Sequence, residues 1–523
     1  MPTPHVHQGK RSPSTLAARA LFTAASIAAL FTRFLHRGLL LGFFQDDFFY
    51  YLKIADNLAL RGISSFDGVH RTNGYHPLWL FTLAGLRWCF HGPAFFVALQ
   101  TLTLASALLV YLGVEQIFRT LHLPQPLRDI ATVVVSMQAL LLLRYGMEVT
   151  LALPLGMAFV ALLLHLDATA PPRRILGIAL LGSLTILARL DAALLVFPLL
   201  LAVLWTDLRL RSPRSLLSLL LGLSPLPLYL AINLRLFHLL LPVSALAKQL
   251  KTTRLPSASS VLGLVSPIDR FKLIFVLPCL ILLALGLLAP GLFAPSRFAK
   301  ARSIRALPRP HRAVLLPMLL FPILQVAVLS FVSDWNLWPW YFYTFVFSST
   351  ASIAMLARPS LLPPVSTTRR MEAAALALAL AYLVYIGAYS VLSPNSVVIY
   401  TSSKRLADYM DLHPGIYAMG DQAGMTGYLS LQPLLQTEGL VMDAEYLGRI
   451  KRREPLREIL ADYNVRYYVA LSWQAPSPCL SLREPGQAGP HSLVSEGVIC
   501  SPPLATFYRD NLPIYVFDAR AIQ

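Results

Sequence analysis

Two adjacent aspartates, Asp46 and Asp47, follow the first long apolar segment of the chain, and four aromatic residues at positions 48–51 come directly after them. An ionisable group at the edge of an apolar segment is energetically costly, and such groups are commonly functional. A carboxylate in this position can act as a general base toward a hydroxyl group. An interfacial cap or a solvated loop is the structural alternative for the same pair.

Further ionisable side chains follow or interrupt later apolar segments; the candidates for substrate binding are His76, Glu148, Arg189, Asp191 and Lys248. Arginine binds phosphate in a bidentate manner, and lysine supplies a compact positive charge. Arg189 is the preferred phosphate ligand, because the neighbouring Asp191 indicates a fixed ion pair. These residues also have structural alternatives, since basic side chains extend to the membrane interface and a single histidine is commonly a hydrogen-bonded structural group.

Asp47 and Glu148 are the candidate ligands for a divalent metal, because Mg²⁺ and Mn²⁺ favour carboxylate oxygens and bridge to phosphate. The four cysteines are scattered without a CxxC spacing, which gives no support for a zinc site or a redox pair. Cys479 and Cys500 are expected to form a disulfide if the C-terminal region lies outside the cytoplasm. Asp334 and the aromatic side chains at positions 335–341 could bind a sugar by stacking, and an interfacial belt is the favoured interpretation of these rings.

The composition identifies lipid as the solvent around most of the chain. With 56% hydrophobic residues, 13% charged residues and a mean hydropathy of +0.59, the 523 residues cannot pack as soluble domains without exposing large apolar surfaces. The net charge of +18 comes from short Lys and Arg clusters between apolar runs and not from one basic face. This pattern indicates the orientation of membrane spans and no nucleic-acid partner.

Basic clusters mark the cytoplasmic side, since positively charged loops resist translocation. Between them the sequence predicts an all-α polytopic membrane bundle with eleven crossings, at residues 16–44, 94–118, 127–145, 151–167, 174–188, 191–206, 214–236, 272–294, 313–333, 338–357 and 371–393. Residues 45–93 form an outer loop with juxtamembrane helices. The apolar stretch 76–90 belongs to this loop, because about 15 residues is short for a span. The alternative is that it crosses the membrane and two later short segments merge, which fits the basic clusters less well. The ionisable candidates all lie on the outer face.

The tail from residue 394 differs in composition from the rest of the chain. Residues 465–470 and 514–517 are β-prone, residues 449–463 have a helical pattern, and turn residues separate these pieces. The sequence therefore predicts two domains: a transmembrane domain over residues 1–393 and a small extracytoplasmic α/β domain over residues 394–523.

The order of the motifs resembles the GT-C superfamily of membrane glycosyltransferases, which includes protein O-mannosyltransferases and bacterial enzymes that use polyprenyl-phosphate sugars. The resemblance is carried by Asp46-Asp47, His76-Pro77, Gly146-Met147-Glu148 and Arg189-Leu190-Asp191, in this order. Leu190 departs from the family pattern, where proline is common. The motifs cover roughly residues 16–250, and the rest of the chain is similar in architecture; residues 420–428 and 437–440 also look like the extracytoplasmic segment of bacterial relatives.

The resemblance implies transfer of a sugar from a polyprenyl-phosphate donor in the lipid bilayer to an extracytoplasmic acceptor, which is a glycan, lipid or protein. The expected reaction is a single displacement with Asp46 or Asp47 as general base, and the resemblance favours Asp46. The expected location is the bacterial cytoplasmic (inner) membrane, with the site and the C-terminal domain outside. A transporter or lipid flippase is the alternative, although the sequence has no two-fold repeat and its acids lie at the outer boundary. An assembly subunit with a decayed site is a second alternative.

Overall fold

The computed structural model describes residues 13–35, 40–166, 170–206, 212–253, 255–257, 309–356, 394–472 and 478–523. The predicted spans at residues 272–294 and 371–393 lie outside the described residues, as do the basic clusters at residues 297–305 and 369–370.

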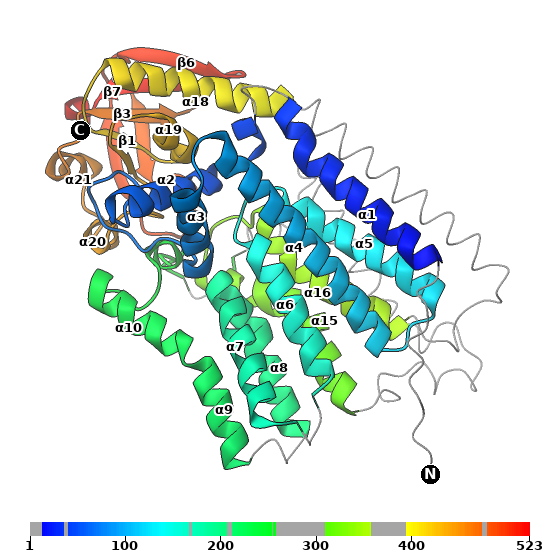
Figure 1. Cartoon of the computed structure of the whole chain (residues 1–523). Helices are drawn as coiled ribbons and strands as arrows, with labels where there is room; N and C mark the ends of the chain where they lie inside the picture. The colour runs from blue at the N-terminus through cyan, green and yellow to red at the C-terminus, as the bar shows by residue number, and fades with distance from the viewer. Residues whose placement is uncertain are drawn as a thin grey trace, which may run out of the picture.

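A helical bundle accounts for most of the described chain, with a helix over each predicted span that falls within it (Figure 1). Several of these helices begin with a proline, which lacks the N–H group that would be unsatisfied in a first turn. The helices are α1 (Pro13–Phe31), α4 (Pro93–Thr120), α5 (Gln125–Leu143), α6 (Val149–Leu164), α7 (Pro172–Ala188), α8 (Ala193–Thr206), α9 (Pro213–Leu223), α10 (Pro225–Phe237), α15 (Arg309–Val332) and α16 (Tyr343–Leu356).

Three helical segments of the described chain are long and apolar enough to cross a membrane by length and composition, namely Pro93–Thr120, Pro213–Phe237 and His311–Val332. The first predicted span is shorter than expected, because α1 ends at Phe31 and the 3-10 helices η1 (Thr32–Leu35) and η2 (Leu40–Phe43) follow it. The mostly helical architecture is confirmed, whereas the number of eleven crossings stays a prediction.

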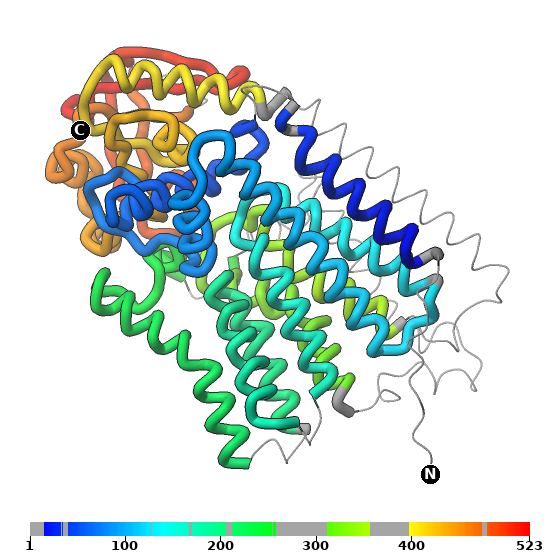
Figure 2. The backbone as a smooth tube through the Cα atoms, in the orientation of Figure 1, coloured from blue at the N-terminus to red at the C-terminus, as the bar shows by residue number. Residues whose placement is uncertain are grey.

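Two further helices connect the bundle with the C-terminal region. α2 (Asp46–Arg61) ends at Gly62, whose φ of 69° is left-handed, as expected for a helix C-cap. α3 (Pro77–Cys89) begins directly after His76, so the stretch 76–90 forms the predicted short helix. Figure 2 shows the blue chain of α2 beside the yellow and orange chain of the C-terminal region, where α2 contacts α19 (Ala423–Leu429).

The C-terminal region forms a small α/β unit. Five strands form a sheet in the order β2-β1-β3-β7-β6, in which β1 is parallel to β2 and β3, and β7 is antiparallel to β3 and β6. The strands β4 and β5 form a separate antiparallel pair. The elements are α18 (Pro394–Leu412), β1 (Tyr417–Met419), β2 (Leu434–Gln436), α20 (Ala444–Lys451), α21 (Leu456–Asp462), β3 (Tyr467–Leu471), β4 (Leu480–Glu484), β5 (Ser495–Ile499), β6 (Ala505–Arg509) and β7 (Leu512–Asp518).

The tail contains the secondary structure that its sequence predicts. The β-prone residues 465–470 and 514–517 correspond to β3 and β7. The helical pattern at 449–463 is divided between α20 and α21, because Pro455 cannot continue a helix and instead caps the second one. The disulfide between Cys479 and Cys500 is present and joins the β4–β5 pair, as predicted.

One apolar core joins the bundle to the C-terminal unit. Phe48 and Phe49 of α2 are fully buried in the same cluster as Tyr417 and Met419 of β1. The ring centres of Phe49 and Tyr428 lie 5.6 Å apart. Burying a phenylalanine side chain stabilises the packed state by about 1.5–3 kcal/mol. The unit is therefore held against α2, and it can contribute residues to a site at the start of that helix.

Candidate active site

Asp46 connects α2 to the C-terminal unit. Its carboxylate accepts hydrogen bonds from the backbone N–H groups of Gly424 and Met425, at 2.9 and 2.8 Å. Burial raises the pKa of Asp46 to about 6, although these two hydrogen bonds lower it. Both carboxylate oxygens are therefore engaged by the backbone of α19.

Asp47 lies beside Asp46 but has a different environment. It is half-buried, and none of the described residues forms a hydrogen bond or an ion pair with its carboxylate. Burial raises the pKa of Asp47 to about 7; the positive charge of Lys248 lowers it, and Asp46 and Glu148 raise it. Asp47 is thus an available carboxylate that changes protonation near neutral pH.

Gly424 has to be a glycine, because a Cβ atom at this position would lie 2.3 Å from the backbone oxygen of Asp46. We expect Gly424→Ala to separate α19 from α2 and to lower stability by about 1–3 kcal/mol, as overpacking typically does. The check is thermal unfolding of the purified full-length protein. Gly85→Ala is the matched control, since nothing lies within 4 Å of a Cβ on Gly85 in α3. Equal unfolding temperatures for the two variants would contradict the close contact.

Arg189 is the centre of a buried charge network. It follows α7 directly and is 1% exposed. Its guanidinium forms an ion pair with Glu148 and donates to Asp191 from Nε at 2.9 Å. Its central carbon also lies 4.6 Å from the ring centre of Tyr341 and 4.7 Å from that of Tyr343. The predicted Arg189–Asp191 pair is present, and Glu148 joins it.

Asp191 is held by partners from later helices. Its carboxylate accepts hydrogen bonds from the Tyr343 hydroxyl at 2.9 Å and from Gln325 Nε2 at 2.7 Å. Gln325 in turn accepts a hydrogen bond from the Thr344 hydroxyl at 3.0 Å. The network thus fixes the end of α7 against α15 and α16.

His76 and Glu148 meet at the same place. The His76 Nδ1 atom accepts a hydrogen bond from the backbone N–H of Leu190 at 3.1 Å, and its Nε2 atom lies 3.8 Å from a Glu148 oxygen. Burial lowers the pKa of His76, although Glu148 raises it. The other carboxylate oxygen of Glu148, Oε2, is buried and has no hydrogen-bond partner among the described residues. Such an atom is available to a ligand that brings a proton or a positive charge.

The positive charge of Lys248 lowers the pKa of Asp47. Its ammonium donates to the Tyr341 hydroxyl at 3.2 Å and lies 5.7 Å from the ring centre of Trp335. Burial lowers the pKa of Lys248, but Tyr341 and Asp47 more than compensate, so the pKa is raised. The lysine therefore stays protonated at neutral pH.

A cavity of about 280 Å³ brings four of the predicted residues together. His76, Arg189, Asp191 and Lys248 line it, together with aromatic and apolar side chains from the 241–249 segment and the 328–341 turn. Two further predicted residues interact with this lining. Glu148 forms an ion pair with Arg189. The pKa of Asp47 is lowered by the charge of Lys248. Residues that are far apart in the sequence therefore converge on one site.

Sequence reasoning missed several residues of this site. Tyr341, for which the sequence suggests an interfacial belt or stacking on a sugar, instead contacts both Arg189 and Lys248. Gln325 lies within the apolar helix α15, and a polar residue in such a helix could have indicated a functional position. Arg509 at the end of β6 has a charge that acts on Asp46 and Asp421. No local pattern around Arg509 distinguishes it from a surface arginine.

Comparisons with known proteins identify the fold. No protein-family model matches the sequence, and no curated protein matches it. The structure resembles the Archaeoglobus fulgidus oligosaccharyltransferase tethered with an acceptor peptide, at 13% identity over 87% of this chain and 69% of that chain, with a TM-score of 0.51. It is also similar to ArnT from Cupriavidus metallidurans in the apo state, at 15% identity over 87% and 93% of the two chains, with a TM-score of 0.49.

The same ArnT bound to undecaprenyl phosphate aligns at 15% identity over 86% of this chain and 80% of that chain, with a TM-score of 0.46. The archaeal oligosaccharyltransferase has the fold of the GT-C glycosyltransferases. The protein described here has the GT-C fold, as the order of its motifs predicted. At these identities the likeness establishes the fold, so the activity has to be argued from the site.

Proposed function

We propose that the protein is a membrane glycosyltransferase that moves a sugar from a polyprenyl-phosphate donor to an acceptor hydroxyl on the outer face of a bacterial inner membrane. The observation that carries this proposal is the position of one available carboxylate, Asp47, beside a lysine-containing cavity at the junction of bundle and C-terminal unit. A base and a phosphate-binding cation are the two groups that the reaction requires.

Asp47 is the better candidate for the base. Asp46 uses both carboxylate oxygens to bind Gly424 and Met425, whereas no described residue engages the carboxylate of Asp47. In a single displacement Asp47 takes the proton of the acceptor hydroxyl. At the same time the hydroxyl oxygen forms a bond to the anomeric carbon of the sugar. The bond from this carbon to the phosphate oxygen breaks at the same time. This assignment differs from the preference for Asp46 that the family resemblance suggests.

Lys248 is the better candidate for contact with the leaving phosphate. The Arg189 nitrogens already bind Glu148 and Asp191, so this arginine serves mainly to hold the site together. Within the part of the chain that the structure describes, the Lys248 ammonium donates one hydrogen bond, to Tyr341, and it retains further donors for the phosphate oxygens. The ranking of the two cations is thus the reverse of the one expected from the sequence.

A second cavity supports a lipid-linked donor. It has a volume of about 430 Å³, and Tyr75, Pro77, Leu187 and Asn233 are among its mostly apolar lining residues. The charged cavity is lined by neighbours of these residues in the sequence: His76 lies between Tyr75 and Pro77, Arg189 follows Leu187 by two residues, and Leu241 follows Asn233 by eight residues. In this proposal the phosphate of a polyprenyl donor binds in the charged cavity and its tail lies in the apolar one.

A divalent metal fits the site together with the donor phosphate. Mg²⁺ is commonly held by one or two carboxylates plus substrate phosphate. The Oε2 atom of Glu148, which accepts no hydrogen bond from the described residues, would supply one ligand, so that Asp47 remains free to act as the base. The ion would add positive charge against the phosphate. The described residues contain no group of three or more His, Cys, Asp or Glu side chains that could hold a metal without substrate.

The proposal is tested by transfer of radiolabelled sugar from polyprenyl phosphate, using membranes that contain the protein. The Asp46→Ala, Asp47→Ala double variant is the negative control. Transfer by the wild type and not by the double variant supports the enzyme. Equal behaviour of the two proteins in a productive assay would remove the catalytic assignment, and movement of the lipid without sugar transfer would favour the flippase alternative.

The pH dependence of transfer gives a separate prediction. A general base acts when deprotonated, so kcat/KM should rise with pH through a midpoint near the Asp47 pKa of about 7. Lys248 lowers this pKa, so Lys248→Met should move the midpoint to higher pH as well as weaken donor binding. The measurement is kcat/KM against pH for both proteins. A midpoint near the ordinary aspartate value of about 3.9 would exclude Asp47 as the base.

A further inference from the structure

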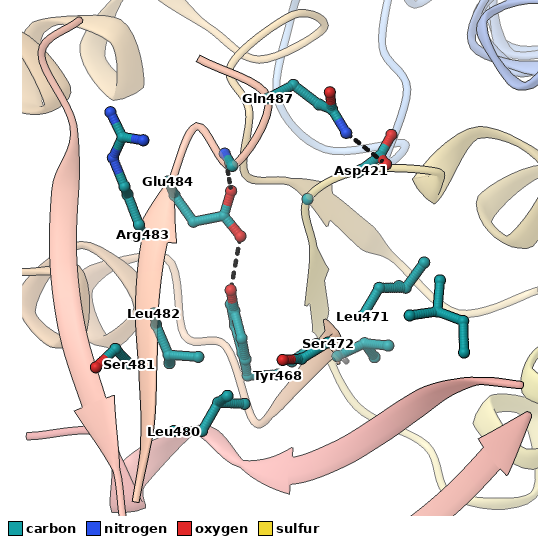
Figure 3. A pocket seen from close by; sticks show the side chains of 15 residues that line it. Asp421, Tyr468, Leu471, Ser472, Leu480, Ser481, Leu482, Arg483, Glu484 and Gln487 are labelled. Atoms are coloured by element: carbon teal, nitrogen blue, oxygen red, sulfur yellow. Dashed lines mark hydrogen bonds between the residues drawn. The ribbon is translucent and has the colours of Figure 1, made fainter. Parts of the chain in front are cut away.

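A separate cavity lies within the C-terminal unit, between β3 and β4 (Figure 3). Its volume is about 350 Å³, which is in the range of small-molecule sites. In Figure 3, Asp421, Gln487 and Glu484 lie in the upper part of the view, and Leu471 lies below Asp421. Tyr468 lies below Glu484, and its hydroxyl points toward that carboxyl group. The cavity thus combines polar groups with an aromatic and aliphatic wall.

The polar groups of this cavity are prearranged. Gln487 donates from Nε2 to the Asp421 carboxylate at 2.8 Å, and its side-chain oxygen receives no hydrogen bond from the described residues. Tyr468 donates its hydroxyl to Glu484 at 2.6 Å. Neighbouring carboxyl and carboxamide groups offer both donors and acceptors. This combination matches hydroxyl groups, which also donate and accept.

The charge of the cavity disfavours anions. Arg483 is the basic residue of its lining, but its guanidinium donates to the backbone oxygens of Ala488 and Gly489, at 3.2 and 2.8 Å. The remaining ionisable groups of the lining, apart from Tyr468, are the carboxyls Asp421 and Glu484. A neutral ligand rich in hydroxyl groups fits this balance better than a phosphate or a carboxylate.

The loop that lines the cavity leads to the residues that bind Asp46, the chain neighbour of the candidate base Asp47. Gly420 and Asp421 line the cavity, and the same loop continues to Gly424, whose N–H binds Asp46. The negative charge of Asp421 acts on both Asp46 and Asp47. A ligand held in the cavity is therefore close to the start of α2.

From this geometry we infer that the cavity binds a neutral sugar residue of the acceptor and so directs an acceptor hydroxyl toward Asp47. The inference rests on the proposed function, since it makes the acceptor a glycan or glycolipid. Asp421 and Gln487 are its hydrogen-bonding residues, and Leu471 and Tyr468 form the wall against which the ring packs.

Ligand-observed saturation-transfer NMR on the full-length protein in nanodiscs tests the inference without any donor. The probes are methyl α-D-glucopyranoside and N-acetylglucosamine, with glucuronate as the anionic comparison. We expect saturable binding of the neutral sugars and none of glucuronate. Gln487→Leu should weaken binding about tenfold. The variant loses the side-chain oxygen that accepts a hydrogen bond from the sugar, and it also loses the hydrogen bond that holds Asp421 in place. Leu471→Trp, which fills the cavity, should abolish it.

Asp47→Asn serves as the variant that distinguishes this inference from the proposed function. It should lose sugar transfer and keep sugar binding. Three results would overturn the inference: no saturable binding of either neutral sugar, equal binding by Gln487→Leu and the wild type, or preferred binding of glucuronate. If one of these three results is found and the protein still transfers sugar in the labelled-donor assay, the inference fails and the proposed function stands.

Discussion

Asp47→Asn is expected to lower the rate of sugar transfer by about 10²–10⁴-fold, the usual contribution of a positioned general base. Asparagine keeps the size of the side chain but cannot accept the acceptor proton. Because no described residue is bonded to the Asp47 carboxylate, the substitution removes no contact that holds the fold. The measurement is kcat with saturating donor, together with the unfolding temperature, which should not change.

Asp46→Asn is the matched comparison, since the two residues are adjacent and chemically identical. It should lower the unfolding temperature, because an amide replaces one of the two oxygens that accept from Gly424 and Met425. Any loss of transfer in this variant should result from displacement of α19. The pH midpoint of its residual activity should remain near the Asp47 pKa of about 7. A full loss of transfer in Asp46→Asn with unchanged stability, and an active Asp47→Asn enzyme, would exchange the two roles.

Arg189→Met is expected to have the largest effect on stability. Removing one partner of a buried ion pair costs about 3–5 kcal/mol, because the other charge remains buried without compensation. Here two carboxylates, Glu148 and Asp191, would lose the same partner. We therefore expect low yields of folded protein and no detectable transfer. Thermal unfolding and gel filtration in detergent measure the first effect.

Arg520→Met is the control for this substitution, because it removes an exposed ion pair with Asp518. The unfolding temperature of this variant should equal that of the wild type. Arg189→Lys should recover part of the stability, because the charge is kept while the two-sided guanidinium contact is lost. A stable Arg189→Met protein would show that the network does not hold α7 against its neighbours.

Much of the architecture could be predicted from local patterns. The helices of the bundle follow from apolar runs, and α2 ends where Gly62 permits a left-handed residue. The strands β3 and β7 follow from short β-prone segments bounded by turns. These features depend on residues that are neighbours in the sequence, so the sequence contains the information directly. The interruption at Pro455 is of the same kind, although the prediction joined the two helices there.

The sequence by itself determined the class of fold and the approximate set of site residues, because apolar runs, turn residues and motif order are local properties. The roles within the set were decided only by the tertiary structure. Asp46 and Asp47 look equivalent in the sequence, but successive residues of a helix point about 100° apart. One carboxylate therefore meets α19, whose Gly424 is 378 residues away, and the other stays accessible beside Lys248. Partners at such separations are fixed by the packing of several elements, which no local pattern records.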